Sequence, residues 1–150
     1  MKAGLHNGQS TEIEIVVTRD MLAEFDGQAV NDLYATSALV HNIEQVCHGL
    51  LTPFLESHEQ VVTSYIEISH LMLTVTGMKV RLKATATEIR ENKIVCEIEA
   101  HNVRGKIAKG SVTQVIVENH WLDRKVKEMS IINNLSSESS LSKNQQYHNE

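Results

Sequence analysis

Three side chains in the 150-residue sequence have types that could take part in acid–base or nucleophilic chemistry: Thr36, Glu44 and His70. Glu44 lies at the edge of the apolar face of a predicted helix, and Thr36 lies at the entrance of that helix. The commoner interpretation of such residues is an N-cap Thr, a solvated Glu and a hydrogen-bonded core His.

The helix that carries two of these residues is predicted over residues 36–57. Thr36 or Ser37 can supply the N-cap oxygen, and Pro53 is expected to disturb the last turn because it lacks an N–H donor. Apolar residues recur at steps of three or four, which is the period of a helix with one buried face. The recurring residues are Leu39, Ile43, Val46, Leu50 and Phe54.

Alternation of apolar and polar residues predicts strands on both sides of the helix. The strand after the helix is expected to place His70 on its inner face, and Thr63 on the opposite face. One long helix against a mostly antiparallel sheet is an α+β architecture. The predicted strands cover residues 11–18, 60–72, 78–90, 94–101 and 106–118.

The segments outside this pattern are expected to be less ordered. Residues 1–10 are predicted to be a flexible lead-in, and residues 19–33 a helical turn followed by a loop. After the domain at residues 11–118, residues 119–132 carry a weak apolar stripe that predicts a short C-terminal helix. Residues 133–150 are rich in Ser, Asn, Gln and Glu, a composition that predicts a disordered polar tail.

Composition narrows the class of protein. The chain is 41% hydrophobic and 22% charged, with a net charge of −5, which argues mildly against a nucleic-acid partner. Cys47 and Cys96 both stand in apolar patterns and are expected to be free thiols in the cytoplasm. No membrane span or signal peptide is predicted, and no phosphate loop, dinucleotide fingerprint, nucleophile elbow or metal motif is present, so no cofactor is expected.

Two segments resemble the hotdog-fold thioesterase superfamily, in particular its fluoroacetyl-CoA thioesterase-like group. LYATSALVHNIEQVCHGLLTPFL resembles the central helix of that group, and residues 69–117 resemble its sheet half, including the Gly110-Ser111 step at the last strand. The resemblance covers about residues 11–118. It implies a hotdog fold, with one long central helix wrapped by an antiparallel sheet of about five strands.

The resemblance also implies roles for particular residues. The group uses a Thr at the helix start, a Glu two turns later and a His at the end of the next strand, and these positions are Thr36, Glu44 and His70 here. Thr63, Gln114 and Gly110 are implied to contact substrate. Thr63 stands where the group has Gly and Gln114 where it has Arg. The group's lid aromatics have no clear match, so no fluoroacetyl selectivity is predicted.

The implied function is hydrolysis of an acyl-CoA thioester to a free acid and CoA by a homodimer with its pocket between subunits. Glu44 would act either as general base on water or as nucleophile, and both roles stay open. The alternative is a non-catalytic hotdog module that binds an acyl-CoA or another small ligand, as the residues at 63 and 114 suggest. A dehydratase would need a His/Asp pattern that the sequence lacks.

Overall fold

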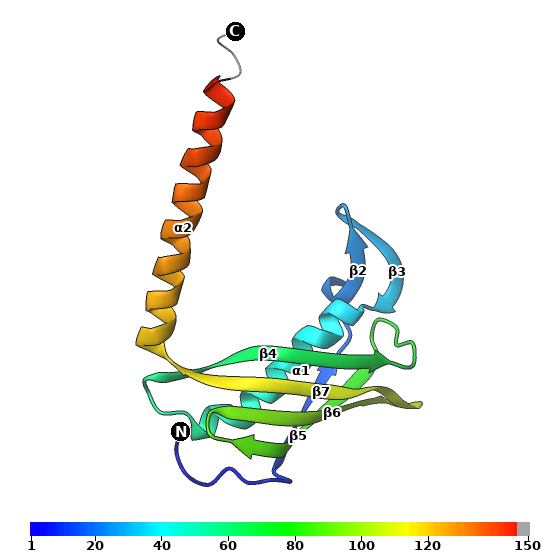
Figure 1. Cartoon of the computed structure of the whole chain (residues 1–150). Coiled ribbons are helices and arrows are strands. Elements are labelled where there is room, and N and C mark those ends of the chain that lie inside the picture. Colours follow the sequence, from blue (N-terminus) through cyan, green and yellow to red (C-terminus); the bar gives the residue numbers. More distant parts are fainter. Residues whose placement is uncertain (147–150) are drawn as a thin grey trace. The chain divides into compact units, whose positions relative to one another are not determined.

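The computed structural model describes the backbone of residues 1–146 and the side chains of residues 1–136. The chain divides into two compact units, Met1–Ile116 and Val117–Glu150. In the first unit, helix α1 (Thr36–Leu51) lies against one face of a five-stranded sheet (Figure 1). This arrangement confirms the predicted α+β architecture of one long helix wrapped by an antiparallel sheet.

The main sheet has the strand order β1-β5-β6-β7-β4. The β1–β5, β5–β6 and β6–β7 pairs are antiparallel. The two edges of the sheet are therefore β1, the first strand of the chain, and β4, the strand directly after α1. The strands are β1 (Ser10–Val16), β4 (Glu59–His70), β5 (Lys79–Arg90), β6 (Lys93–Asn102) and β7 (Gly105–Glu118).

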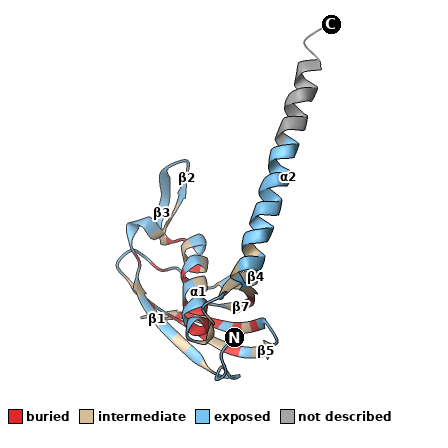
Figure 2. Cartoon of the chain, turned by 90° about the vertical axis from the view of Figure 1, so that its left-hand side faces the viewer, coloured by how far each residue is buried: buried red, intermediate tan, exposed pale blue. Residues whose placement is uncertain are grey.

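The core forms where the apolar face of α1 meets the inner face of the sheet, and buried residues gather there in Figure 2. Burial of these side chains provides the main driving force that holds the helix on the sheet. Leu39, Ile43, Val46 and Leu50 are all buried, as their spacing predicts. The inner faces of the strands contribute Val80, Leu82, Ile94, Cys96, Ile98, Ile107 and Val112.

Helix α1 is shorter than predicted and starts differently. It ends at Leu51, and Thr52–Phe54 form a 3-10 turn (η2) instead of a further helical turn. Pro53 lacks an N–H donor and crowds the preceding turn, so the α-helix cannot continue through it. The N-cap residue is Ala35, and no side chain caps the helix. The Thr36 side chain is used elsewhere, as described below.

The segment before α1 is a hairpin, so the prediction of a loop there is wrong. A 3-10 turn (η1, Arg19–Met21) leads into β2 (Leu22–Phe25), which pairs antiparallel with β3 (Gln28–Tyr34). Asp26 and Gly27, between the strands, have φ angles of 53° and 77°. An Asp-Gly pair accepts positive φ at both central positions of a tight hairpin turn, and this is the signal that identifies the hairpin.

The alternation of inward and outward side chains along β4 breaks midway, so the first half of the strand has the opposite phase to the one predicted. Ser64 and Tyr65 are both exposed. His70 therefore lies on the inner side as predicted, but Val62 is exposed and Thr63 is half-buried, the opposite of the expected phase. A single break in period-two alternation moves every residue on one side of it to the other face.

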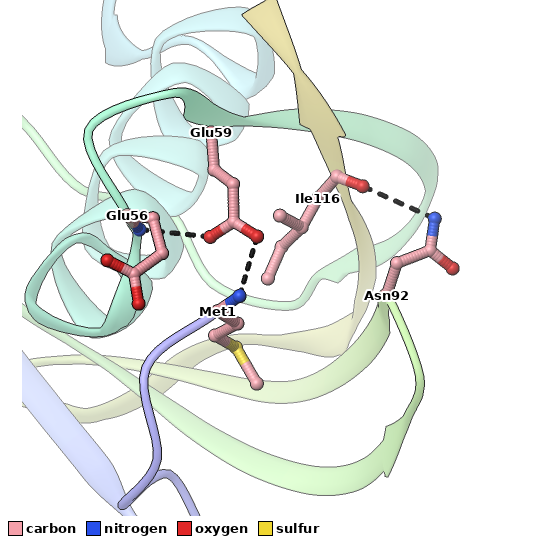
Figure 3. Close-up of polar contacts among 5 residues, drawn as sticks. All are labelled: Met1, Glu56, Glu59, Asn92 and Ile116. Carbon is pink, nitrogen blue, oxygen red and sulfur yellow. Dashed lines mark hydrogen bonds and ion pairs between the residues drawn. The ribbon is translucent and has the colours of Figure 1, made fainter.

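The lead-in makes defined contacts, although a flexible segment was predicted. The Met1 ammonium lies 2.5 Å from the Glu59 carboxylate, which also accepts the Glu56 N–H at 2.9 Å (Figure 3). Gly8 N–H donates to the Ala86 carbonyl and Ala86 N–H donates to the Gln9 carbonyl, which extends the pairing beyond β1. Nearby, the Asn92 amide donates to the Ile116 carbonyl at 3.2 Å (Figure 3).

The second unit consists mainly of α2 (Asn119–Gln146). The predicted helix at residues 119–132 is present, but it continues through residues 133–146, where disorder was expected. This stretch contains no Gly or Pro to interrupt a helix that has already started. Residues 147–150 of the predicted tail lie outside the described residues. Within the described part of the chain, neither helix combines the length and the apolar character that a membrane span requires.

Candidate active site

Thr36 and His70 meet at the N-terminal end of α1. The Thr36 Oγ1 lies 3.0 Å from the His70 Nδ1, which joins the first residue of the helix to the last residue of β4. Backbone bonds fix the chain just before the helix, because Ala35 N–H donates to the Met21 carbonyl at 2.9 Å and Tyr34 N–H donates to the Thr74 carbonyl at 2.8 Å. The structure thus brings together two of the three side chains singled out in the sequence.

The imidazole of His70 is partly enclosed. Its Nε2 is buried and has no well-formed hydrogen bond within the described chain. Burial lowers the pKa of His70 from its ordinary value of 6.5, and the backbone of Met72 opposes this shift through a hydrogen-bonding contact with the ring. The ring is therefore neutral at physiological pH, with one nitrogen as donor and the other as acceptor.

Glu44 lies two turns further along α1, on the half-exposed edge of the helix. Eight helical residues place it about 12 Å along the axis and about 80° around from Thr36. Its carboxylate makes no hydrogen bond or ion pair with residues 1–136, and no contact joins it to Thr36 or His70. In the single chain, Glu44 is therefore separate from Thr36 and His70, and no donor among residues 1–136 binds its carboxylate oxygens.

Cys47 and Cys96 do not provide a nucleophile. Both thiols are buried and free, as the sequence predicts. The neighbouring Cys96 thiol, burial and the charge of Glu44 all raise the pKa of Cys47. Because both thiols lie in the core, neither is accessible to a substrate.

The residues expected to contact substrate form a second group on β4 and β7. The Gln114 amide, 2% exposed, donates to the Thr63 hydroxyl at 3.1 Å. Gly110 has a packing reason for its position, because a Cβ there would come within 2.0 Å of the Glu67 carbonyl oxygen. The structure therefore joins Thr63 to Gln114, and it gives Gly110 a role in the close approach of β7 to β4.

Sequence reasoning missed Tyr34, which contacts His70, and Asn42, which binds Tyr34. The rings of Tyr34 and His70 pack edge to face, with centroids 6.3 Å apart and an interplanar angle of 76°. The Tyr34 hydroxyl donates to the Asn42 Oδ1 at 2.7 Å in a buried contact. The available signal was Asn42 itself, since it is a polar residue on the side of the helix that carries the apolar stripe.

The family model described as fluoroacetyl-CoA-specific thioesterase matches residues 17–120. No curated protein matched the chain at the significance required. Among solved structures, a Thermus thermophilus protein described as a thioesterase superfamily member is 28% identical, with a TM-score of 0.84, over 89% of this chain and 98% of that one.

Two further structures share the fold at lower identity. A mutant of the fluoroacetyl-CoA-specific thioesterase FlK is 19% identical, with a TM-score of 0.79, over 85% of this chain and 99% of that chain. A hypothetical thioesterase from Streptococcus pneumoniae, solved with coenzyme A, is 13% identical, with a TM-score of 0.62, over 77% of this chain and 84% of that chain. Because the family model covers well over half of the sequence, the chain belongs to the fluoroacetyl-CoA-specific thioesterase family and is a hotdog-fold acyl-CoA thioesterase.

Proposed function

We propose that the chain hydrolyses its acyl-CoA substrate at a site formed by Thr36, His70 and Glu44. The contact of 3.0 Å between Thr36 and His70 at the start of α1 carries this proposal. This contact places the imidazole beside the N-terminus of a helix. A thioester carbonyl that reacts there would find both a polar side-chain pair and backbone donors.

The start of α1 supports the proposal because its first backbone N–H groups have no hydrogen-bond acceptor within the helix. Leu39 N–H donates to the Ala35 carbonyl, so the helix itself provides no partners for the N–H groups of the three residues before it. No side chain caps these groups. Backbone N–H groups and the positive end of the helix dipole stabilise negative charge, such as the charge that develops on the carbonyl oxygen of a reacting thioester.

In the proposed reaction, a water oxygen forms a bond to the thioester carbonyl carbon, and the C–S bond then breaks. Glu44, as general base, takes the proton of the water, and the CoA thiolate leaves and is protonated by the Glu44 carboxylic acid or by solvent, while the neutral His70 ring contributes hydrogen bonds. If Glu44 attacks directly instead, an acyl anhydride forms and water then cleaves it. The products are the same free acid and CoA. Thr36 holds the imidazole and can also contact the substrate.

We propose a homodimer in which the site is completed at a subunit boundary. Strand β4 is an edge of the main sheet, so its outer backbone groups have no neighbouring strand among residues 1–146. An unpaired edge of this length favours pairing with another strand. Large exposed apolar side chains along and after it support the same conclusion; they are Val62, Tyr65, Leu71, Leu73 and Val75. The second subunit would also enclose Glu44.

Two further proposals concern the acyl pocket and the cellular compartment. We propose that Gln114 and Thr63 line the acyl pocket together with Gly110. Both side chains are uncharged, so they offer hydrogen bonds but no ion pair to the acyl group. Free buried thiols suit a reducing compartment, so we propose a cytoplasmic protein.

The test is release of CoA thiol from a panel of short, branched, aromatic and fluorinated acyl-CoAs. We expect turnover with at least one member, and loss of that turnover in Glu44→Gln, which keeps the shape and removes the charge. Glu97→Gln, on an exposed residue of β6, is the matched control and should keep full activity. Tight binding of acyl-CoA without thiol release by the wild-type chain would reverse the proposal in favour of a binding module. Full activity in Glu44→Gln would remove Glu44 from the mechanism.

A further inference from the structure

Asn42 is an unusual residue for its place in the fold. It is 5% exposed and lies on the buried side of α1, among positions otherwise occupied by apolar residues. A buried amide is costly unless its polar atoms have partners. Its Oδ1 accepts the Tyr34 hydroxyl at 2.7 Å, and its Nδ2 lies 3.4 Å from the Gln45 Oε1. The short bond to Tyr34 is therefore the contact that makes Asn42 tolerable there.

Tyr34 is held at both ends. Its hydroxyl is bound to Asn42, and its backbone N–H donates to the Thr74 carbonyl at 2.8 Å. Thr74 is buried too, and its hydroxyl accepts the Asn102 amide at 3.0 Å. This series of bonds links the hairpin, the segment after β4 and the end of β6. With both ends bound and only 2% of its surface exposed, the Tyr34 ring has little freedom to move.

The edge-to-face contact of this ring with His70 gives the imidazole a fixed wall. Thr36 holds Nδ1 from one direction, and the Tyr34 ring restricts rotation of the imidazole from another. A single hydrogen bond fixes one nitrogen, but leaves the ring able to rotate about that contact. Two contacts of different kinds set the direction in which Nε2 points.

We propose that Tyr34 and Asn42 are positioning residues for His70: Asn42 holds the Tyr34 ring, and the ring holds the imidazole in the orientation in which Nδ1 meets the Thr36 hydroxyl. This inference rests on the proposed function of His70, and it adds two residues that the family resemblance does not supply. Neither residue touches the reacting atoms. Their effect reaches the reaction only through the orientation of the imidazole.

The test uses four variants chosen to separate the ring from the hydroxyl. Tyr34→Leu removes the aromatic wall. Tyr34→Phe keeps the ring but leaves the Asn42 Oδ1 without its hydrogen-bond donor. Asn42→Leu leaves the Tyr34 hydroxyl without its acceptor. The double variant, Tyr34→Phe with Asn42→Leu, keeps the ring and leaves no unpaired polar atom, a replacement that can be nearly neutral for stability. Val112→Ala, a buried truncation in β7, is the control for loss of stability alone.

Two measurements are needed. The first is steady-state kinetics, which gives kcat and KM for thiol release. The second is NMR of the His70 imidazole, which gives its signals and their titration with pH. We expect Tyr34→Leu to lower kcat about tenfold or more, because small displacements of a catalytic group are costly, with KM changed less than twofold. Tyr34→Phe and Asn42→Leu should lower kcat several-fold, and the double variant should regain most of it. The His70 signals should shift in the same order, and Val112→Ala should leave kcat and those signals unchanged.

The proposal is overturned if folded Tyr34→Leu keeps the kcat and the His70 signals of the Val112→Ala control. If Tyr34→Leu does not fold, the two polar single variants and their double variant decide. Recovery of the His70 signals in the double variant then supports the proposal, and unchanged signals in all three overturn it. The NMR measurement needs no substrate. If the wild-type chain releases no thiol, the proposed function is refuted, but the NMR signals still test whether Tyr34 and Asn42 position His70.

Discussion

The Thr36 hydroxyl lies 3.0 Å from the His70 Nδ1, although the two residues are 34 positions apart in the sequence. The contact connects the first turn of α1 to the end of the edge strand β4. The helix begins without a side-chain cap because its N-cap residue, Ala35, has no side-chain oxygen, and the Thr36 hydroxyl meets the imidazole. The uncapped N–H groups are thereby left for a ligand.

Removal of the Thr36 hydroxyl should affect turnover far more than stability. Thr36 is exposed, so Thr36→Ala leaves no cavity. We expect kcat to fall about tenfold to a hundredfold, because a group that orients a catalytic residue contributes on this scale. Thr36→Ser, which keeps the hydroxyl, should retain most of the activity. Ser37→Ala, at the neighbouring exposed position, is the control, and equal losses in Thr36→Ala and Ser37→Ala would contradict a specific role for Thr36.

Stability should depend on pH through His70. Burial lowers the pKa of His70 in the folded chain below its ordinary 6.5, so the unfolded chain binds a proton more readily. The stability that this residue provides is therefore complete above about pH 6.5, and it is lost as the pH falls toward the lowered folded pKa. Denaturant unfolding between about pH 5 and pH 8 should show this decrease in the wild type and a smaller one in His70→Gln. Identical curves for both, with His41→Gln as the exposed control, would contradict it.

Gly110→Ala should destabilise the chain, because a Cβ at this position would overlap the Glu67 carbonyl oxygen at 2.0 Å. The oxygen belongs to the backbone and cannot turn aside, so β4 and β7 must separate locally. We expect a loss of about 1–3 kcal/mol in the free energy of unfolding. Gly49→Ala on α1 is the matched control, since nothing lies within 4 Å of the added carbon. There the substitution should stabilise by about 0.5–1 kcal/mol.

The proposed dimer predicts a different effect of charge at the two sheet edges. Tyr65 on β4 and Val16 on β1 are both exposed, and both strands are edges of the main sheet. Tyr65→Lys should shift the mass measured by light scattering from two chains toward one, and activity should fall with it. Val16→Lys should leave both unchanged. A wild-type chain that is monomeric at assay concentration would rule out the shared site.

The local patterns of the sequence determined the long helix and the strands of the main sheet, and they placed Glu44 and His70 near the core. The 3.6-residue period identified the core of α1, and alternation placed the strands of the main sheet, because these periods follow from backbone geometry alone. Alternation also put His70 on the inner face of β4. Pro53 indicated that the helix would be disturbed, but only the structure shows that it ends at Leu51.

Tertiary packing decided which of these side chains meet. The break in alternation at Ser64 and Tyr65 brings Thr63 to Gln114, and no short-range pattern reports such a break. The Tyr34–Asn42 bond depends on how the hairpin is fixed to the segment after β4, which is a long-range contact. A sequence period states which face a residue occupies, whereas the distance between two faces is set by how the whole core packs.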